Sequence, residues 1–129
     1  MEQVAKYLLF LLITFSIYSC DTLSYIELEN KMQSTVYYKT FYHKDSSQVH
    51  NDIDIELSKE HPKAGIIFGF GHLWNKNTIK KYVNTIDRIE ISSEKKCTSI
   101  DNKRNMYQFF LNRRKGLFYS KMKITFEDM

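Results

Sequence analysis

The sequence is poor in the residues that mark several classes of protein. Its 129 residues include only 4 Gly, 1 Pro and 2 Cys. Two cysteines are too few for a disulfide-rich scaffold, and so little Gly and Pro excludes a collagen-like repeat. The hydrophobic share of 43% is close to that of globular proteins, which argues against a disordered chain. A chain of this length has room for one ordinary domain.

The motifs of common enzymes are also missing. There is no Gly-x-Ser-x-Gly, and the Ser-x-x-Lys sequences at 93–96 and 120–123 have no companion motifs. The Gly-x-Gly at 69–71 has Trp74 where a dinucleotide-binding loop would need its third glycine. We therefore predict no catalytic residues and no cofactor, and we expect a protein that is not an enzyme.

The histidines do not form a metal-binding pattern. Zinc sites usually include two ligands a few residues apart, and no histidine here has another His or Cys two to four residues away. An oxygen-rich site built from His50, Asp52 and Asp54 is the one alternative. We predict no metal site and expect solvated loop histidines: His43, His50, His61 and His72.

The N-terminus contains an uncharged apolar run. Tyr7–Ser19 has 13 residues and follows Lys6, whereas a membrane-spanning helix needs roughly 20. This pattern is typical of the apolar region of a signal peptide. The last three residues of this run and the cysteine that follows, Ile17-Tyr18-Ser19-Cys20, resemble a bacterial lipobox, which has an aliphatic residue, a small residue and then an obligatory cysteine.

The lipobox resemblance implies that residues 1–19 are a lipoprotein signal peptide. The leader would be removed before Cys20, the Cys20 thiol would take a diacylglycerol, and 20–24 would form a tether. One acyl chain binds a membrane only marginally, but two or three on one residue hold it stably. Two alternatives are a plain secretory leader and an uncleaved signal anchor. If Cys20 is not lipidated, it could form a disulfide with Cys97; otherwise Cys97 is expected to be a turn or partly buried residue without a role.

Charge is distributed unevenly along the chain. The net charge is +4, and removal of residues 1–19 would leave it unchanged because the segment holds one Glu and one Lys. Residues 45–60 contain five acidic residues and one Lys, whereas 103–123 contain seven Lys or Arg and no acid. The basic stretch could meet anionic lipid or an acidic partner, or form a solvated helix face. Nucleic acid is not an expected partner of an exported protein.

Alternating apolar and polar residues predict a mainly β fold. We expect a single β-rich α+β domain over 25–129, either a small antiparallel sandwich or a sheet with one or two short helices. Polar residues at 30–34 predict a hairpin that joins its first two strands. The six predicted strands cover 25–29, 35–43, 53–57, 64–70, 86–91 and 122–126.

Two helices are predicted between these strands. The first would be capped by Asn75 or Asn77 and would bury Ile79, Tyr82 and Val83. The second would run from a cap at Asp101 through Lys115, with Met106, Phe109 and Phe110 on one face and Gly116 as the glycine after its last turn.

Aromatic residues suggest a binding surface. Tyr37, Lys39 and Phe41 would lie on one face of their strand, because side chains alternate along a strand. Trp74 could offer a ring for stacking, although packing in the core is the alternative. If the face is exposed, Tyr37, Lys39, Phe41 and Trp74 form the predicted binding surface.

The sequence resembles short lipobox-bearing lipoproteins of the Bacteroidota. The resemblance rests on the lipobox, Glu29-Asn30-Lys31, Val36-Tyr37-Tyr38-Lys39, the segment 71–74 and the amphipathic last strand. It implies a protein anchored to the inner or outer membrane, facing the periplasm or the cell surface. We expect a small non-enzymatic domain that contacts an envelope protein. An immunity or inhibitor lipoprotein that blocks a toxin or hydrolase is the alternative.

Overall fold

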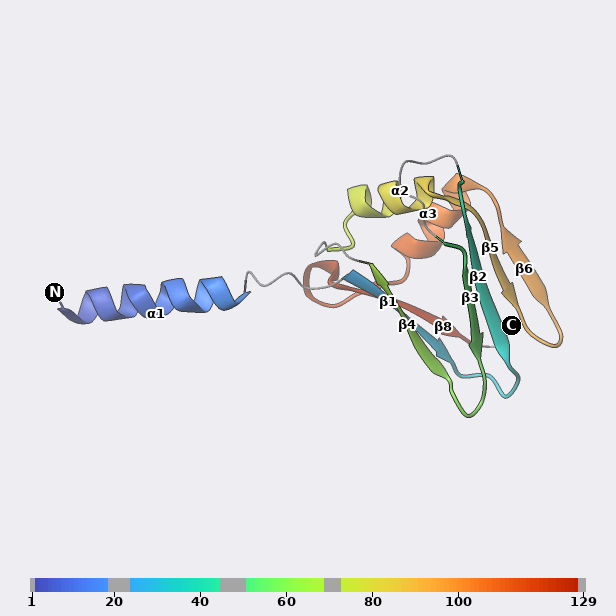
Figure 1. The fold of residues 1–129 in the computed structure, drawn as a ribbon, viewed down its shortest axis with the longest axis horizontal. Helices are drawn as coiled ribbons and strands as arrows, with labels where there is room; N and C mark the ends of the chain where they lie inside the picture. Colours follow the sequence, from blue (N-terminus) through green and yellow to red (C-terminus); the bar gives the residue numbers. More distant parts are fainter. Residues whose placement is uncertain (1, 19–23, 45–50, 69–72, 128–129) are drawn as a thin grey trace.

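The computed structural model describes residues 2–18, 24–44, 51–68 and 73–127 (Figure 1). Two four-stranded sheets make up most of the fold. The first, which we name the β1 sheet, has the order β4-β1-β8-β7, and the second, the β2 sheet, has the order β3-β2-β5-β6. The strands of the β1 sheet are β1 (Ser24–Asn30), β4 (Lys63–Phe68), β7 (Arg114–Lys115) and β8 (Lys121–Phe126), and those of the β2 sheet are β2 (Val36–Tyr42), β3 (Ile53–Leu57), β5 (Ile86–Ser92) and β6 (Cys97–Ile100).

The alternation of apolar residues places one face of each sheet in a shared core. Along β2, Val36, Tyr38, Thr40 and Tyr42 are buried, and Met122, Ile124 and Phe126 are buried along β8. The rings of Tyr38 and Phe126 lie 6.2 Å apart and join the two sheets across this core. The predicted mainly β fold with short helices is therefore confirmed.

The predicted hairpin of the first two strands is wrong. β1 pairs with β4 and β8, whereas β2 pairs with β3 and β5, so the link at 31–35 crosses from one sheet to the other. The buried Asn30 amide Nδ2 donates to the carbonyls of Ser34 (2.9 Å) and Leu57 (2.8 Å), and its Oδ1 accepts from the Met32 amide (2.8 Å). These hydrogen bonds pair backbone groups of the link between the two sheets, so the link does not need the ladder of a hairpin.

The expectation of antiparallel pairing holds for every strand pair but one. β1 and β8 run parallel, with Ile26 opposite Met122 and Leu28 opposite Ile124. Parallel neighbours need a long connection, and here the rest of the domain lies between the two strands in sequence. As a result, β1 and β8 both begin at one end of the domain. We name it the tether end, because the chain enters the domain there at Ser24.

The helices pack on the core near the tether end (Figure 1). α2 (Lys76–Asn84) is capped by Asn75, whose side chain accepts from the Thr78 amide at 2.8 Å, so that cap prediction is confirmed. α3 (Lys103–Leu111) is capped by Asn102 rather than Asp101 and ends at Leu111 rather than Lys115. The chain leaves the helix at Leu111 because β7 must pair with β8.

Gly116 does not end α3. It follows β7 with φ of 84° and precedes a 3-10 turn, η1 (Leu117–Tyr119), so its left-handed backbone turns the chain between two elements of the β1 sheet region. Strand β6 was also not predicted. Three of its four residues are exposed because it lies at the edge of its sheet, so it lacks the alternation that predicts a half-buried strand.

The N-terminal apolar run forms helix α1 (Glu2–Tyr18), which lies apart from the two sheets in Figure 1. Its side chains from Val4 to Ile13 include large apolar groups that are more than half exposed. Among the helices of the described residues, none is long and apolar enough to cross a membrane.

Candidate binding surface

The outer face of the β2 sheet brings together three of the four predicted surface residues. Tyr37, Lys39 and Phe41 alternate with the buried residues of β2 and so point away from the core. The Tyr37 ring is 39% exposed, and Lys39 and Phe41 are partly exposed. We name this face, with its neighbours on β3 and β5, the β2 outer face.

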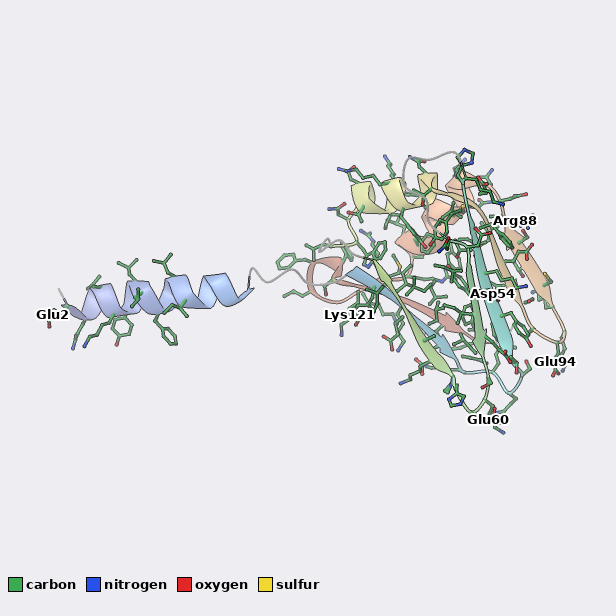
Figure 2. The ribbon with its side chains drawn as sticks, in the orientation of Figure 1. Glu2, Asp54, Glu60, Arg88, Glu94 and Lys121 are labelled. Atoms are coloured by element: carbon green, nitrogen blue, oxygen red, sulfur yellow. The ribbon has the colours of Figure 1, made fainter. Side chains whose placement is uncertain are left out.

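Charged side chains flank these residues on both neighbouring strands. Lys39 lies opposite Asp54, and their Nζ and Oδ2 atoms are 4.0 Å apart. On the other side, the Arg88 guanidinium carbon lies 4.5 Å from the centre of the Phe41 ring, and Arg88 Nε lies 3.0 Å from Glu90 Oε1. Figure 2 labels Asp54 and Arg88 on this sheet. The face therefore combines aromatic area with charged side chains of both signs.

A hollow of about 420 Å³ continues this face at the end of β2. Phe41 and Arg88 form part of its lining, together with His43, whose Nδ1 lies 3.0 Å from Asp87 Oδ1. Tyr42 also lines this hollow, and its hydroxyl lies 2.9 Å from the Tyr82 hydroxyl. Burial raises the pKa of Tyr42 to about 12, so this hydroxyl is neutral at neutral pH.

Trp74 does not belong to the β2 outer face, which corrects the prediction. The Trp74 side chain is only 2% exposed. Its ring meets the Tyr82 ring edge-on at 5.9 Å, and Tyr82 in turn meets Phe110 at 5.2 Å. Trp74 is thus part of the aromatic core under the helices, and its ring is not available for stacking with a ligand.

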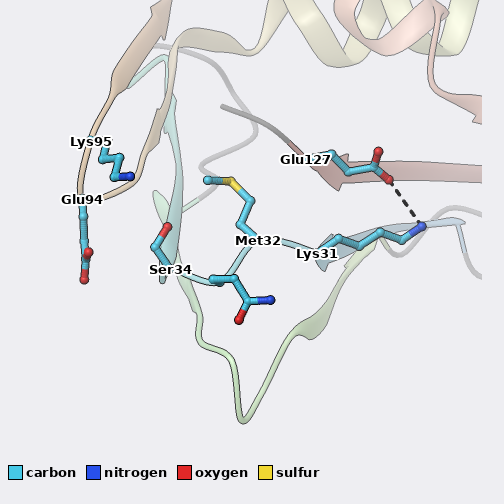
Figure 3. Close-up of a pocket in the computed structure, with 7 residues that line it drawn as sticks. Lys31, Met32, Ser34, Glu94, Lys95 and Glu127 are labelled. Atoms are coloured by element: carbon cyan, nitrogen blue, oxygen red, sulfur yellow. Dashed lines mark ion pairs between the residues drawn. The ribbon is translucent and has the colours of Figure 1, made fainter.

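A second hollow was not predicted from the sequence. It measures about 850 Å³ and lies at the far end of the domain, by which we mean the loops at 31–35, 58–62 and 93–96 with Glu127. Figure 3 shows its wall, where Lys31 Nζ lies 3.4 Å from Glu127 Oε1. Its lining combines charged and polar side chains with Met32 and comes from three separate segments, so no local sequence pattern predicts it.

The remaining site predictions concern cysteine and metal. Cys20, the predicted lipid-attachment residue, lies outside the described residues, as does His50 of the alternative metal site. Cys97 is an exposed free cysteine at the start of β6, not a turn residue or a partly buried one. In the part of the chain that the structure describes, no group of three or more His, Cys, Asp or Glu side chains could hold a metal ion.

Comparisons with known proteins found no match to this chain. No model of a protein family matches the chain. No curated protein and no solved structure gives a significant match.

Proposed function

We propose that this protein is a membrane-anchored bacterial lipoprotein with a small, non-enzymatic binding domain in the cell envelope. The observation that supports it most is the helix α1, whose described side chains from Val4 to Ile13 expose large apolar groups and which precedes Cys20 in the sequence. The side chains of Tyr7, Leu8 and Leu9 are 71%, 58% and 61% exposed. Such a segment fits a leader that is recognised in a membrane and then removed.

In this proposal the anchor is the N-terminal cysteine. Thioether-linked diacylglycerol and an amide-linked acyl chain on Cys20 would bury tens of methylene groups, each contributing about 0.8 kcal/mol. The domain would then sit at the inner or outer membrane surface, facing the periplasm or the outside of the cell. Its proposed partners are the membrane and an envelope protein.

The β2 outer face is the proposed protein-binding surface. It offers Tyr37 and the Phe41–Arg88 stack beside the charged pair of Lys39 and Asp54. Tyr and Arg are enriched at protein interfaces because they supply large contact areas with a polar end. The opposing charges beside them would fix the orientation of the partner.

The anchor is tested by the intact mass of the protein from the membrane fraction of a bacterial host. We expect a chain that starts at Cys20 and carries acyl chains. The variant Cys20→Ser should lose this mass, whereas Cys97→Ser, the matched control, should keep it. A wild-type protein that is soluble and unmodified would overturn the anchor and favour secretion with a Cys20–Cys97 disulfide.

The binding face is tested by photocrosslinking in the same host. Benzoylphenylalanine in place of Tyr37 should give a discrete protein adduct, and Arg88→Ala should reduce its yield. The same group in place of Glu60, at the far end, is the control and should not give that adduct. Equal adducts from both positions would argue against the β2 outer face. A single toxin or hydrolase in the adduct would favour the alternative of an immunity or inhibitor lipoprotein.

A further inference from the structure

The tether end of the domain carries an exposed apolar cluster. The side chains of Leu117 and Phe118 are 80% and 73% exposed, and Leu73, which precedes Trp74, is 43% exposed. Ile67, at the same end of the β1 sheet but on its other edge strand, is 69% exposed. The Trp74 amide donates to the Tyr119 carbonyl at 2.8 Å, which holds the segment of Leu73 against η1. We name the four residues Ile67, Leu73, Leu117 and Phe118 the η1 patch.

The chain topology places the η1 patch where the N-terminal segment arrives. β1 begins at Ser24, opposite the end of β4, and Tyr25 pairs with Ile67. η1 leads directly into β8, which starts beside β1. In Figures 1 and 2, the η1 region and Lys121 lie on the side of the domain that faces α1, while Glu60 and Glu94 lie at the far end.

The backbone of η1 is held in an unfavourable conformation that exposes these side chains. Phe118 and Tyr119 have φ values of 55° and 56°, the left-handed region that residues with a Cβ avoid. The Tyr119 ring is fixed by the Arg114 guanidinium, whose carbon lies 3.7 Å from the ring centre. Strained backbone of this kind clusters at functional sites. Here it accompanies the exposure of Leu117 and Phe118 to water.

Two lysines beside η1 indicate the charge of that contact. Lys115 and Lys121 lie directly opposite each other in the β7–β8 pair. Like charges in this position repel each other, and within the described residues neither forms an ion pair. An anion between or below them would relieve the repulsion.

We propose that the η1 patch is a second membrane contact, in which Leu117 and Phe118 enter the headgroup region of an anionic phospholipid bilayer and Lys115 and Lys121 bind its phosphates. The inference rests on the proposed anchor at Cys20. The four residue steps from Cys20 to Ser24 span at most about 14 Å, so the tether end must stay close to the surface. A short tether gives an effective concentration of roughly millimolar, so a contact too weak to recruit a free protein is formed by an anchored one.

This contact would orient the domain. With the tether end on the bilayer, the far end and its hollow point away from the membrane, and the β2 outer face stands beside the surface rather than against it. A partner could therefore reach Tyr37 and Phe41 while the protein remains anchored.

The test uses the full chain, isolated from the host membrane and reconstituted in vesicles of phosphatidylcholine with phosphatidylglycerol. Benzoylphenylalanine in place of Phe118 should give a phospholipid adduct after irradiation, detected by intact mass. The same group in place of Tyr37 should give little or none. Vesicles of phosphatidylcholine alone should lower the yield at position 118.

Charge variants give a second readout with the same probe at position 118. Lys115→Gln or Lys121→Gln should each lower the adduct yield about fivefold, the factor that corresponds to about 1 kcal/mol for each lysine at an anionic surface. Lys95→Gln, at the far end, is the matched control and should leave the yield unchanged.

The possible failures can be told apart. An acylated protein with no lipid adduct at position 118, or with equal adducts at 118 and 37, overturns the η1 contact and leaves the anchor intact. A protein adduct from position 118 in cells would replace the bilayer with a protein partner. A soluble protein without acyl chains overturns both proposals.

Discussion

The two ends of the domain differ in how their loops and turns are stabilised. At the far end, Asn30 is 5% exposed and its side chain makes three hydrogen bonds to the backbone of crossing loops. At the tether end, the chain turns through Gly116 and two residues with left-handed backbone, and large apolar side chains remain in water. The far end thus pairs the polar atoms of the buried Asn30 side chain internally, whereas the tether end has an unfavourable conformation that an outside contact could offset.

The largest expected effect on stability comes from removing the Asn30 hydrogen bonds at the far end. Asn30→Ala removes two donated bonds and one accepted bond at a buried position, so the free energy of unfolding should fall by about 3 kcal/mol. The measurement is urea unfolding of the full chain in detergent micelles, followed by the fluorescence of the single Trp. Gln33→Ala, exposed in the same loop, is the control and should change stability by less than about 0.5 kcal/mol. Equal losses in both variants would show that the loop, not the Asn30 side chain, is responsible.

The next effect concerns the turn at the tether end. A Cβ at Gly116 would meet Ser120 Oγ at 2.8 Å, and its φ of 84° disfavours any side chain. Gly116→Ala should therefore lower the free energy of unfolding by about 1–2 kcal/mol. Gly65→Ala is the matched control, because the nearest atom to its Cβ is Ile26 O at an ordinary 3.9 Å. The same unfolding experiment compares them, and a loss at Gly65 as large as that at Gly116 would contradict the prediction.

The contrast between the ends also shows what could be predicted from the sequence. Strands such as 53–57 and 122–126 were predictable because a half-buried strand alternates apolar and polar residues, and each of these segments alternates by itself. The partner of each strand was not predictable. Polar residues at 30–34 are typical of a hairpin, but Asn30 uses its side chain to bridge two sheets, and that role depends on Leu57, which is distant in sequence.

The candidate binding surface was predicted in part for the same reason. Tyr37, Lys39 and Phe41 share a face through the period of a strand, which is local information. Trp74 has no such periodic context, and its burial is decided by Tyr82 on α2 and by the turn at η1. The η1 patch itself was missed because large apolar residues such as Leu117 and Phe118 usually pack in a core, and their exposure follows from the backbone geometry of η1.

A smaller effect should separate stability from membrane contact at η1. Phe118→Gly relieves the left-handed backbone, so we expect a gain of about 0.5–1 kcal/mol in the free energy of unfolding in micelles. Leu117→Gly is the control, because Leu117 is not among the residues with positive φ, and it should give no gain. In vesicles, both variants should weaken the lipid contact by removing an apolar side chain. A loss of stability in Phe118→Gly would contradict the prediction. It would mean that the contacts of the Phe118 ring stabilise the folded domain by more than its left-handed backbone destabilises it.

The smallest effect concerns an ion pair on the β1 sheet, between the two ends. Lys123 Nζ lies 2.9 Å from Glu29 Oε2, and the hydrogen bond from Lys123 lowers the pKa of Glu29 while it raises that of Lys123. A lowered carboxyl pKa stabilises the fold above about pH 4.5, the ordinary value, and this stabilisation is lost as the pH falls through the lowered value. A raised amine pKa stabilises the fold below about pH 10.5 and is lost as the pH rises through the raised value.

The ion pair should therefore stabilise the fold across the neutral pH range, and this stabilisation should be lost at both low and high pH. Urea midpoints measured from pH 3 to 7 should rise with pH in the wild-type chain, and the rise should be shallower in Lys123→Gln. Lys39→Gln breaks a pair with a longer separation of 4.0 Å and is the control that should keep the wild-type slope. If Lys123→Gln also keeps that slope, the acid sensitivity of the domain lies elsewhere.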